Sequence, residues 1–148
     1  MKELFFKYWF KGFDEALDNI NENDKNEIFK YCGRACSDSY TKQIYVDEFV
    51  KADNINDFIK RLMKRFPEIE YQIIKDNEEI ILMYRFCACD LVKDGYISNP
   101  SLCECSRQSL LYNWGTVIGE SNVDIKLMKS ILNGDDCCQF NISISTGG

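Results

Sequence analysis

The chain contains no histidine among its 148 residues, and this absence excludes several familiar kinds of site. Without an imidazole there is no Ser-His or Cys-His catalytic pair, and no zinc finger with mixed cysteine and histidine ligands. The chain instead carries eight cysteines in local pairs: Cys32 with Cys36, Cys87 with Cys89, Cys103 with Cys105, and Cys137 with Cys138. Their options are ligation of a metal or cluster, redox exchange, nucleophilic attack without imidazole, disulfide formation, or burial.

The chain also lacks a long hydrophobic run. The strongest one, Ile80–Tyr84, is far shorter than the about 20 residues that a membrane-spanning helix needs, so no membrane partner is expected. The first residues show no uninterrupted apolar stretch with a cleavage site, so no secretory signal is predicted. We therefore expect a cytoplasmic protein, in which thiols stay reduced and disulfides are the weaker interpretation.

Positive charge is in deficit, because 18 lysines and arginines face 24 acidic residues and the net charge is −6. Nucleic-acid-binding proteins usually carry a basic surface, so no nucleic-acid partner is expected. The one basic cluster, within residues 60–65, recurs at helical spacing opposite an apolar stripe and is interpreted as a solvated helix face. A small-molecule ligand and a homodimer are the partners left open.

Hydrophobic periodicity predicts a helical first half and a mostly stranded second half. Apolar residues three or four positions apart predict helices over residues 2–20, 24–36, 43–50 and 54–66, and Asp24 with Glu27 is predicted to cap the second. Alternation predicts strands over residues 69–74, 80–87, 123–132 and 137–145, with a helix over residues 106–118 between the middle two. This order predicts a single α+β domain over residues 1–148. The N-terminal helices and the helix between the hairpins would pack on a four-stranded antiparallel sheet made of two hairpins.

The second hairpin can be predicted down to its register. Asn133-Gly134 between two β-rich runs is a strong signal for a two-residue turn. Centring the turn on these residues pairs apolar side chains throughout: Leu127 with Phe140, Ile125 with Ile142, and Val123 with Ile144. The same register turns Cys138 into the apolar layer and Cys137 onto the opposite face.

The segment from Cys87 to Cys105 is the strongest candidate for a metal site. Cys87 and Cys89 share one side of their predicted strand, and Cys103 and Cys105 lie just before the helix that Ser106 is predicted to cap. Two cysteine pairs joined by a loop are typical of a four-thiolate zinc site, and an iron–sulfur cluster is the alternative. The helix N-terminus is expected to favour the thiolate form of Cys105. The remaining apolar-face cysteines, Cys32, Cys36 and Cys138, are expected to be buried.

Three stretches resemble one bacterial and archaeal group of proteins: Cys87-Ala88-Cys89, Pro100–Ser106 and Ser130–Phe140. The last contains a Gly-Asp-x-x-Cys-x-Phe element at Gly134, Asp135, Cys138 and Phe140, and Cys32–Cys36 is similar to a helical motif near the start of such proteins. The group comprises small domains related to the 4-vinyl-reductase domain and proteins labelled L-2-amino-thiazoline-4-carboxylic acid hydrolase. The resemblance implies helices packed on an antiparallel sheet, and a domain that binds small molecules, sometimes with a metal.

Two functions are hypotheses at this point. The leading one is a cytoplasmic domain that binds a metal, zinc foremost, or a small molecule through the thiolates of Cys87, Cys89, Cys103 and Cys105. The alternative, suggested by the resemblance, is a cysteine-dependent hydrolase of a small cyclic amide or thiazoline-type compound. Cys105 would then be the nucleophile and Glu104 or Asp135 the proton acceptor, because the chain has no histidine to serve as base.

Overall fold

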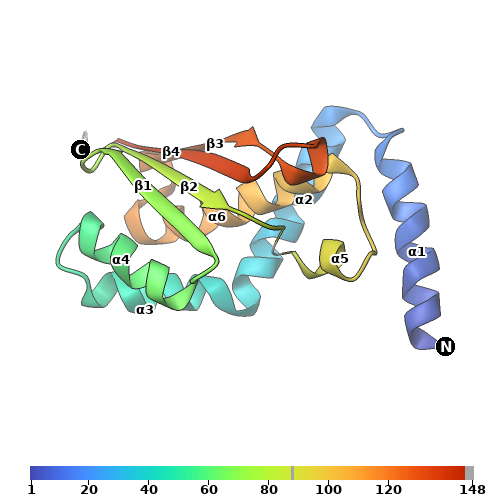
Figure 1. Ribbon diagram of the computed structural model, residues 1–148, viewed down its shortest axis with the longest axis horizontal. Coiled ribbons are helices and arrows are strands. Elements are labelled where there is room, and N and C mark those ends of the chain that lie inside the picture. Colours follow the sequence, from blue (N-terminus) through green and yellow to red (C-terminus); the bar gives the residue numbers. More distant parts are fainter. Residues whose placement is uncertain (88, 146–148) are drawn as a thin grey trace.

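The computed structural model describes residues 1–87 and 89–145, and it places a four-stranded antiparallel sheet against several helices (Figure 1). The helices are α1 (Lys2–Leu17), α2 (Glu22–Cys36), α3 (Lys42–Lys51), α4 (Ile55–Arg65), the short α5 (Asp90–Lys93) and α6 (Cys103–Ile118). The strands are β1 (Ile69–Lys75), β2 (Glu79–Tyr84), β3 (Val123–Lys129) and β4 (Cys138–Ile144). Their order across the sheet is β1-β2-β4-β3, which confirms the predicted α+β class and its two hairpins.

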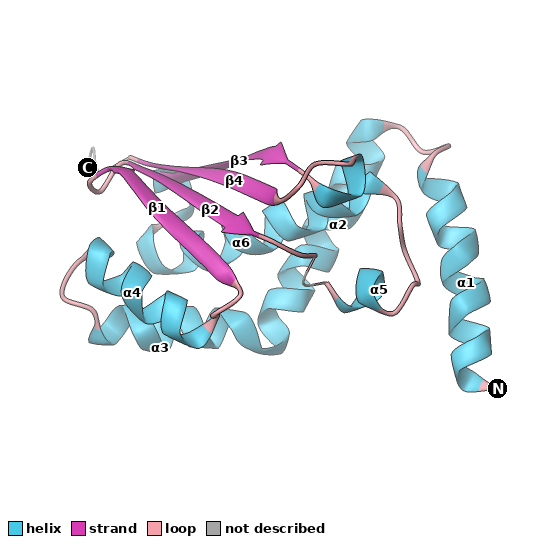
Figure 2. Ribbon diagram, viewed as in Figure 1, coloured by secondary structure: helices cyan, strands magenta, loops and turns pink. Residues whose placement is uncertain are grey.

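One face of the sheet is covered by α3, α4 and α6, and the main core lies between them (Figure 2). Trp114 of α6 is fully buried at its centre, with Phe58 of α4 and Tyr45 of α3 packed edge-on against it at ring-centre distances of 5.2 Å and 6.2 Å. The inward side chains of β4 are Cys138, Phe140, Ile142 and Ile144, all buried, as alternation requires.

The register of the second hairpin is confirmed, but its turn is not. Leu127, Ile125 and Val123 pair with Phe140, Ile142 and Ile144 as predicted. The ladder then shifts between Leu127 and Lys129, and β3 ends there. A 3-10 turn at Ile131–Asn133 followed by Gly134 in the left-handed conformation, φ 96°, replaces the two-residue turn. Polarity matching along the strands therefore set the register independently of the turn.

Several predicted boundaries are wrong, each for a local reason. Helix α2 begins at Glu22, two residues before Asp24, because Asn21 is its N-cap: the side chain of Asn21 accepts a hydrogen bond from the backbone N–H of Asp24 at 2.9 Å. Helix α6 begins at Cys103 rather than Ser106, since a 3-10 turn that starts at Pro100 leads directly into it. Strand β2 ends at Tyr84, so Cys87 follows the strand instead of belonging to it.

A smaller apolar cluster lies at the far end of the molecule, where α1 packs (Figure 1). Its buried members are Leu17 of α1, Phe29 of α2, and Ile97 and Leu102 from the segment that precedes α6. Cys89 and Cys105 pack against this cluster, so it supports one side of the cysteine-rich region. Among the helices of the described residues, none is long and apolar enough to cross a membrane.

Candidate functional site

The first predicted cysteine pair lies on an irregular segment. Cys87 follows β2, and Cys89 occupies the position just before α5, where its backbone is extended. Both side chains are half-buried, and Ala88 between them lies outside the described residues. The expectation that strand alternation places both thiols on one side therefore does not apply, because neither residue is in a strand.

The second predicted pair is split by the helix that contains it. Cys103 and Cys105 belong to the first turn of α6, and positions two apart on a helix do not face one another. The Cys103 thiol is buried, 2.9 Å from the hydroxyl oxygen of Ser130. The Cys105 thiol instead packs with the smaller apolar cluster beside α2. A single ion bound by both thiols would require the start of α6 to unwind.

The residues of the Gly-Asp-x-x-Cys-x-Phe element have structural roles in the loop between β3 and β4. The carboxylate of Asp135 accepts a hydrogen bond from the backbone N–H of Ser130 at 2.8 Å. The thiol of Cys138 accepts one from the backbone N–H of Ile131 at 3.4 Å. Gly134 supplies the left-handed turn, and Phe140 is core. These residues close the β3–β4 loop, which leaves Asp135 engaged with the backbone.

Helices α2 and α6 approach unusually closely at Gly33. A methyl group at Gly33 would lie 2.6 Å from the carbonyl oxygen of Cys105 and 2.9 Å from the backbone nitrogen of Ser109. At the residue directly after α2, the hydroxyl oxygen of Ser37 is 2.6 Å from that of Ser109 of α6. This close packing brings Cys32 and Cys36, one helical turn apart on either side of Gly33, alongside Cys105.

The ionisation of Cys105 shows which thiols surround it. Burial is the main cause that raises the pKa of Cys105 to about 12, and the charges that Cys32, Cys36 and Cys89 would carry as thiolates contribute to the rise. Three thiols from two other segments, α2 and the residue before α5, therefore lie within electrostatic range of Cys105. The expectation that the helix N-terminus favours its thiolate is wrong for the metal-free chain, since burial and neighbouring negative charge outweigh the helix dipole.

The other thiols follow the same pattern. Burial raises the pKa of Cys89, Cys103 and Cys138, and nearby thiols add to it in each case. The pKa of Cys36 is also raised, first by burial and then by the charge of Asp90 at the start of α5. Within residues 1–87 and 89–145, no three side chains of cysteine, aspartate or glutamate already stand where they could hold one metal ion.

The sequence interpretation missed the neighbourhood of α2. Cys32 and Cys36 were expected to be buried and are exposed, whereas Cys138 is buried as predicted. The Cys-Gly-x-x-Cys spacing contains the signal: glycine between two cysteines one helical turn apart lets a neighbouring helix come close to both. Nothing local in the sequence shows that the neighbour is α6.

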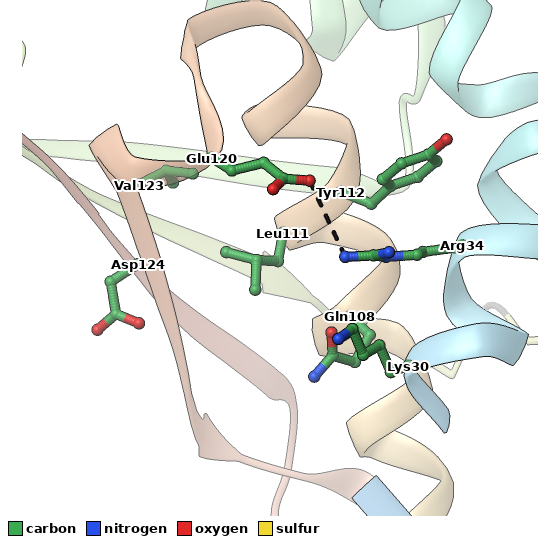
Figure 3. Close-up of a pocket in the computed structure, with 8 residues that line it drawn as sticks. All are labelled: Lys30, Arg34, Gln108, Leu111, Tyr112, Glu120, Val123 and Asp124. Atoms are coloured by element: carbon green, nitrogen blue, oxygen red, sulfur yellow. Dashed lines mark ion pairs between the residues drawn. The ribbon is translucent and has the colours of Figure 1, made fainter. Parts of the chain in front are cut away.

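A cavity of about 380 Å³ is lined by side chains of α2 and α6, by Glu120 and by the start of β3 (Figure 3). Lys30 and Arg34, one turn apart on α2, form a cationic wall, and Glu120 and Asp124 lie on the opposite side. The guanidinium of Arg34 is 3.9 Å from the carboxylate of Glu120 and lies over the ring of Tyr112, 5.6 Å from its centre. The cavity is therefore dipolar, with one wall of each charge.

Comparison of the chain with protein-family models gave no match, and comparison with curated proteins gave none either. The resemblance to 4-vinyl-reductase-related domains and thiazoline hydrolases stays a prediction.

Proposed function

We propose that this protein binds a zinc ion through a thiolate site centred on Cys105, with Cys32, Cys36 and Cys89 as its partners. The observation that carries the proposal is the gathering of these three thiols around Cys105 from two other segments, α2 and the residue before α5. Four thiolates are a donor set that suits Zn²⁺, which takes tetrahedral sulfur ligation at about 2.3 Å.

The physical argument is one of charge. Burial is the main cause of the raised pKa values of Cys36, Cys89 and Cys105, and neighbouring negative charge adds to it: that of Asp90 for Cys36, and that of other thiolates for Cys89 and Cys105. Without a cation, these thiols therefore resist ionisation. A bound Zn²⁺ reverses that balance, because it neutralises the thiolates and favours their deprotonation. Since no three ligands are already in place among the described residues, the ion would draw the thiols inward and hold α5 against α2 and α6.

This ligand set retains two cysteines of the sequence-predicted set, Cys89 and Cys105. Cys32 and Cys36 take the place of Cys87 and Cys103. Cys103 is engaged with Ser130, and its place in α6 turns it away from Cys105. Cys32 and Cys36 are exposed and one turn apart on a single helix face, so both can reach an ion beside Cys105.

The test is zinc content after anaerobic purification. Wild-type protein is expected to hold one zinc per chain, and Cys36→Ser and Cys105→Ser each to lose it. Cys137→Ser, at the other end of the cysteine set, is the matched control and should keep its zinc. If Cys87→Ser and Cys103→Ser lose zinc but Cys36→Ser does not, the proposed ligand set is wrong and the ligands are those predicted from the sequence. An absorption spectrum with sulfur-to-iron bands would indicate a cluster instead of zinc.

A small molecule in the dipolar cavity is a second candidate, favoured by the opposed charges of its walls. Lys30 and Arg34 suit a carboxylate, and Glu120 suits an ammonium or amidinium group at the other end of the same ligand. The volume of about 380 Å³ fits a small metabolite. We expect a free amino acid mixture to raise the thermal unfolding midpoint of the wild type and leave that of Arg34→Gln unchanged; equal shifts in both would contradict binding there.

The hydrolase alternative finds less support around Cys105. A thiol whose pKa lies near 12 is almost wholly protonated at neutral pH and is a weak nucleophile. Burial alone would raise the pKa of Glu104, but hydrogen bonds from Arg107 at 2.7 Å and Gln108 at 3.0 Å outweigh it and hold the pKa below its usual value. A carboxylate held in this way is a poor proton acceptor. The carboxylate of Asp135 already accepts a hydrogen bond from the backbone N–H of Ser130.

A further inference from the structure

The thiols of Cys103 and Cys138 lie together at the loop that follows β3. The sulfur of Cys103, the first residue of α6, is 2.9 Å from the hydroxyl oxygen of Ser130. The sulfur of Cys138, the first residue of β4, accepts a hydrogen bond from the backbone N–H of Ile131 at 3.4 Å. Ser130 and Ile131 are consecutive residues. Two thiols from distant parts of the chain therefore contact the same two residues.

The electrostatics of Cys103 agrees with this placement. Burial is the main cause that raises its pKa, and the hydrogen bond with Ser130 opposes the rise. Among the neighbouring charges, the one that Cys138 would carry as a thiolate raises this pKa most. Both cysteines are buried, with 7% and 8% of their surface exposed. Cys103 and Cys138 are therefore close neighbours that share a site shielded from solvent.

The loop that contacts both sulfurs is held by its own hydrogen bonds. The backbone N–H of Ser130 donates to the carboxylate of Asp135 at 2.8 Å, and its carbonyl oxygen accepts from the backbone N–H of Asp135 at 3.0 Å. The side chain of Ser130 is itself buried, with 1% of the residue exposed. Cys138 is fixed by its strand, in which it pairs with Tyr84 of β2. The two thiols are thus held near one another by the surrounding fold.

A pair of thiols in this position suits a disulfide better than a metal ion. Within residues 1–87 and 89–145, no three side chains of cysteine, aspartate or glutamate stand where they could hold one ion, whereas a disulfide needs two sulfurs only. Both thiols are free. They also lie outside the ligand set proposed for zinc, so the pair stays available in zinc-bound protein.

We propose that Cys103 and Cys138 are a redox pair that closes to a disulfide on reaction with hydrogen peroxide. One sulfur attacks an oxygen of the peroxide, the O–O bond breaks, and a sulfenic acid and one water molecule are formed. The second sulfur attacks the sulfenic sulfur, the S–O bond breaks, the S–S bond forms and a second water molecule leaves. The two sulfurs lose two electrons to the peroxide, and the two thiol protons leave in the water.

Burial shapes this reaction in two ways. It favours the protonated thiols, so we expect the pair to react slowly and to respond to sustained exposure to peroxide. The neighbouring thiol then converts the sulfenic acid to a disulfide before a second peroxide can oxidise it to sulfinic acid. The bond ties the start of α6 to the start of β4, so oxidation is recorded as a covalent link between helix and sheet.

The test is differential alkylation of the whole zinc-bound protein after exposure to hydrogen peroxide. Free thiols are blocked with one maleimide in denaturant, disulfides are then reduced, and the newly freed thiols are labelled with an isotopically heavy maleimide. Fragment mass spectra read each cysteine separately. We expect the heavy label on Cys103 and Cys138 and the light label on Cys105 and Cys137, their near neighbours in sequence. The proposal is overturned if Cys103 and Cys138 stay light or are found as sulfinic acids.

The partners of the bond are identified by trypsin digestion without reductant. Peptides 94–107 and 130–148 should appear as one linked species. Cys103→Ser and Cys138→Ser should each abolish this species, whereas the matched controls Cys105→Ser and Cys137→Ser should keep it. The opposite pattern would contradict the pairing. Alkylation of the unaltered chain covers the case in which a variant fails to fold.

The same exposure of metal-free protein separates this proposal from the zinc site. We expect the bond between Cys103 and Cys138 to form to the same extent with and without zinc. A disulfide that forms in metal-free protein even when the zinc proposal fails still supports the redox pair. If the two thiols are oxidised only after zinc has been removed, they are metal ligands and the redox pair is wrong.

Discussion

The closest contact between α2 and α6 can be perturbed by a single methyl group, in Gly33→Ala. The added Cβ would meet three atoms of α6 at once: the carbonyl oxygen of Cys105 at 2.6 Å, Cβ of Gln108 at 2.9 Å and the backbone nitrogen of Ser109 at 2.9 Å. Two of these are backbone atoms, which cannot rotate away. The helices must therefore separate, and Cys32 and Cys36 must move away from Cys105.

Two effects of opposite sign decide the size of the change. Replacing glycine by alanine inside a helix normally stabilises a protein by about 0.5–1 kcal/mol, because glycine loses more conformational freedom on folding. Forcing an extra group into a packed interface costs about 1–3 kcal/mol. The clash with backbone places Gly33→Ala at the upper part of that range, so we expect the free energy of unfolding to fall by about 1–2 kcal/mol in total.

Urea denaturation followed by circular dichroism measures this change, with Gly12→Ala as the control. Gly12 lies within α1, and no heavy atom lies within 4 Å of the position of its missing Cβ. Gly12→Ala should be neutral or stabilising by up to about 1 kcal/mol. Gly33→Ala should also lower the affinity for zinc. If Gly33→Ala proves as stable as Gly12→Ala and keeps its zinc, the close packing of α2 on α6 is refuted.

Four further outcomes are expected. Gly134→Ala should destabilise by about 1–2 kcal/mol in urea denaturation, because φ is 96° there while nothing obstructs the added methyl group; no loss would contradict the left-handed turn. Cys138→Ala should lower the free energy of unfolding by on the order of 1 kcal/mol, because it leaves a small cavity in the core, whereas Cys137→Ser should be nearly neutral. The reverse order would contradict the burial of Cys138. In metal-free protein, Cys105 should be alkylated much more slowly at pH 8 than the exposed Cys32, as mass spectrometry of modified peptides would show, because burial raises the pKa of Cys105 to about 12. Burial likewise raises the pKa of Tyr45 from 10.0 to about 12, so the protonated phenol contributes about 2–3 kcal/mol to the free energy of unfolding; this contribution is complete below pH 10 and is lost as the pH rises towards 12. Phenolate absorbance should show that Tyr45 ionises only as the protein unfolds. Ionisation near pH 10 in the folded state would contradict the burial of Tyr45.

Strand pairing was predictable because it rests on a repeated local pattern. Along β3 and β4, each apolar residue faces an apolar partner, and any shift by one residue would expose Phe140 and Ile142. The turn was not predictable from Asn133-Gly134 alone, because the backbone of Ser130 is held by Asp135 and the thiol of Cys138 by Ile131, contacts that no local propensity expresses.

The candidate site was only partly predictable, since its geometry depends on packing between distant segments. Spacing grouped Cys89 and Cys105 with Cys87 and Cys103 in one candidate site, and in the structure Cys89 lies within electrostatic range of Cys105. It could not show that Cys103 turns to Ser130, which follows from where α6 begins. Nor could it show that Cys32 and Cys36 lie beside Cys105, because that contact is created by tertiary packing at Gly33.

A titration of metal-free protein with Co²⁺ under anaerobic conditions tests the proposed thiolate site most directly, because cobalt replaces zinc in tetrahedral sulfur sites and is coloured. We expect one equivalent to produce intense sulfur-to-cobalt absorption with tetrahedral visible bands, both removed by one equivalent of Zn²⁺ and both weakened in Cys36→Ser and Cys105→Ser. A spectrum without sulfur-to-cobalt bands, with all eight thiols as reactive after metal addition as before, would contradict a metal site at Cys105.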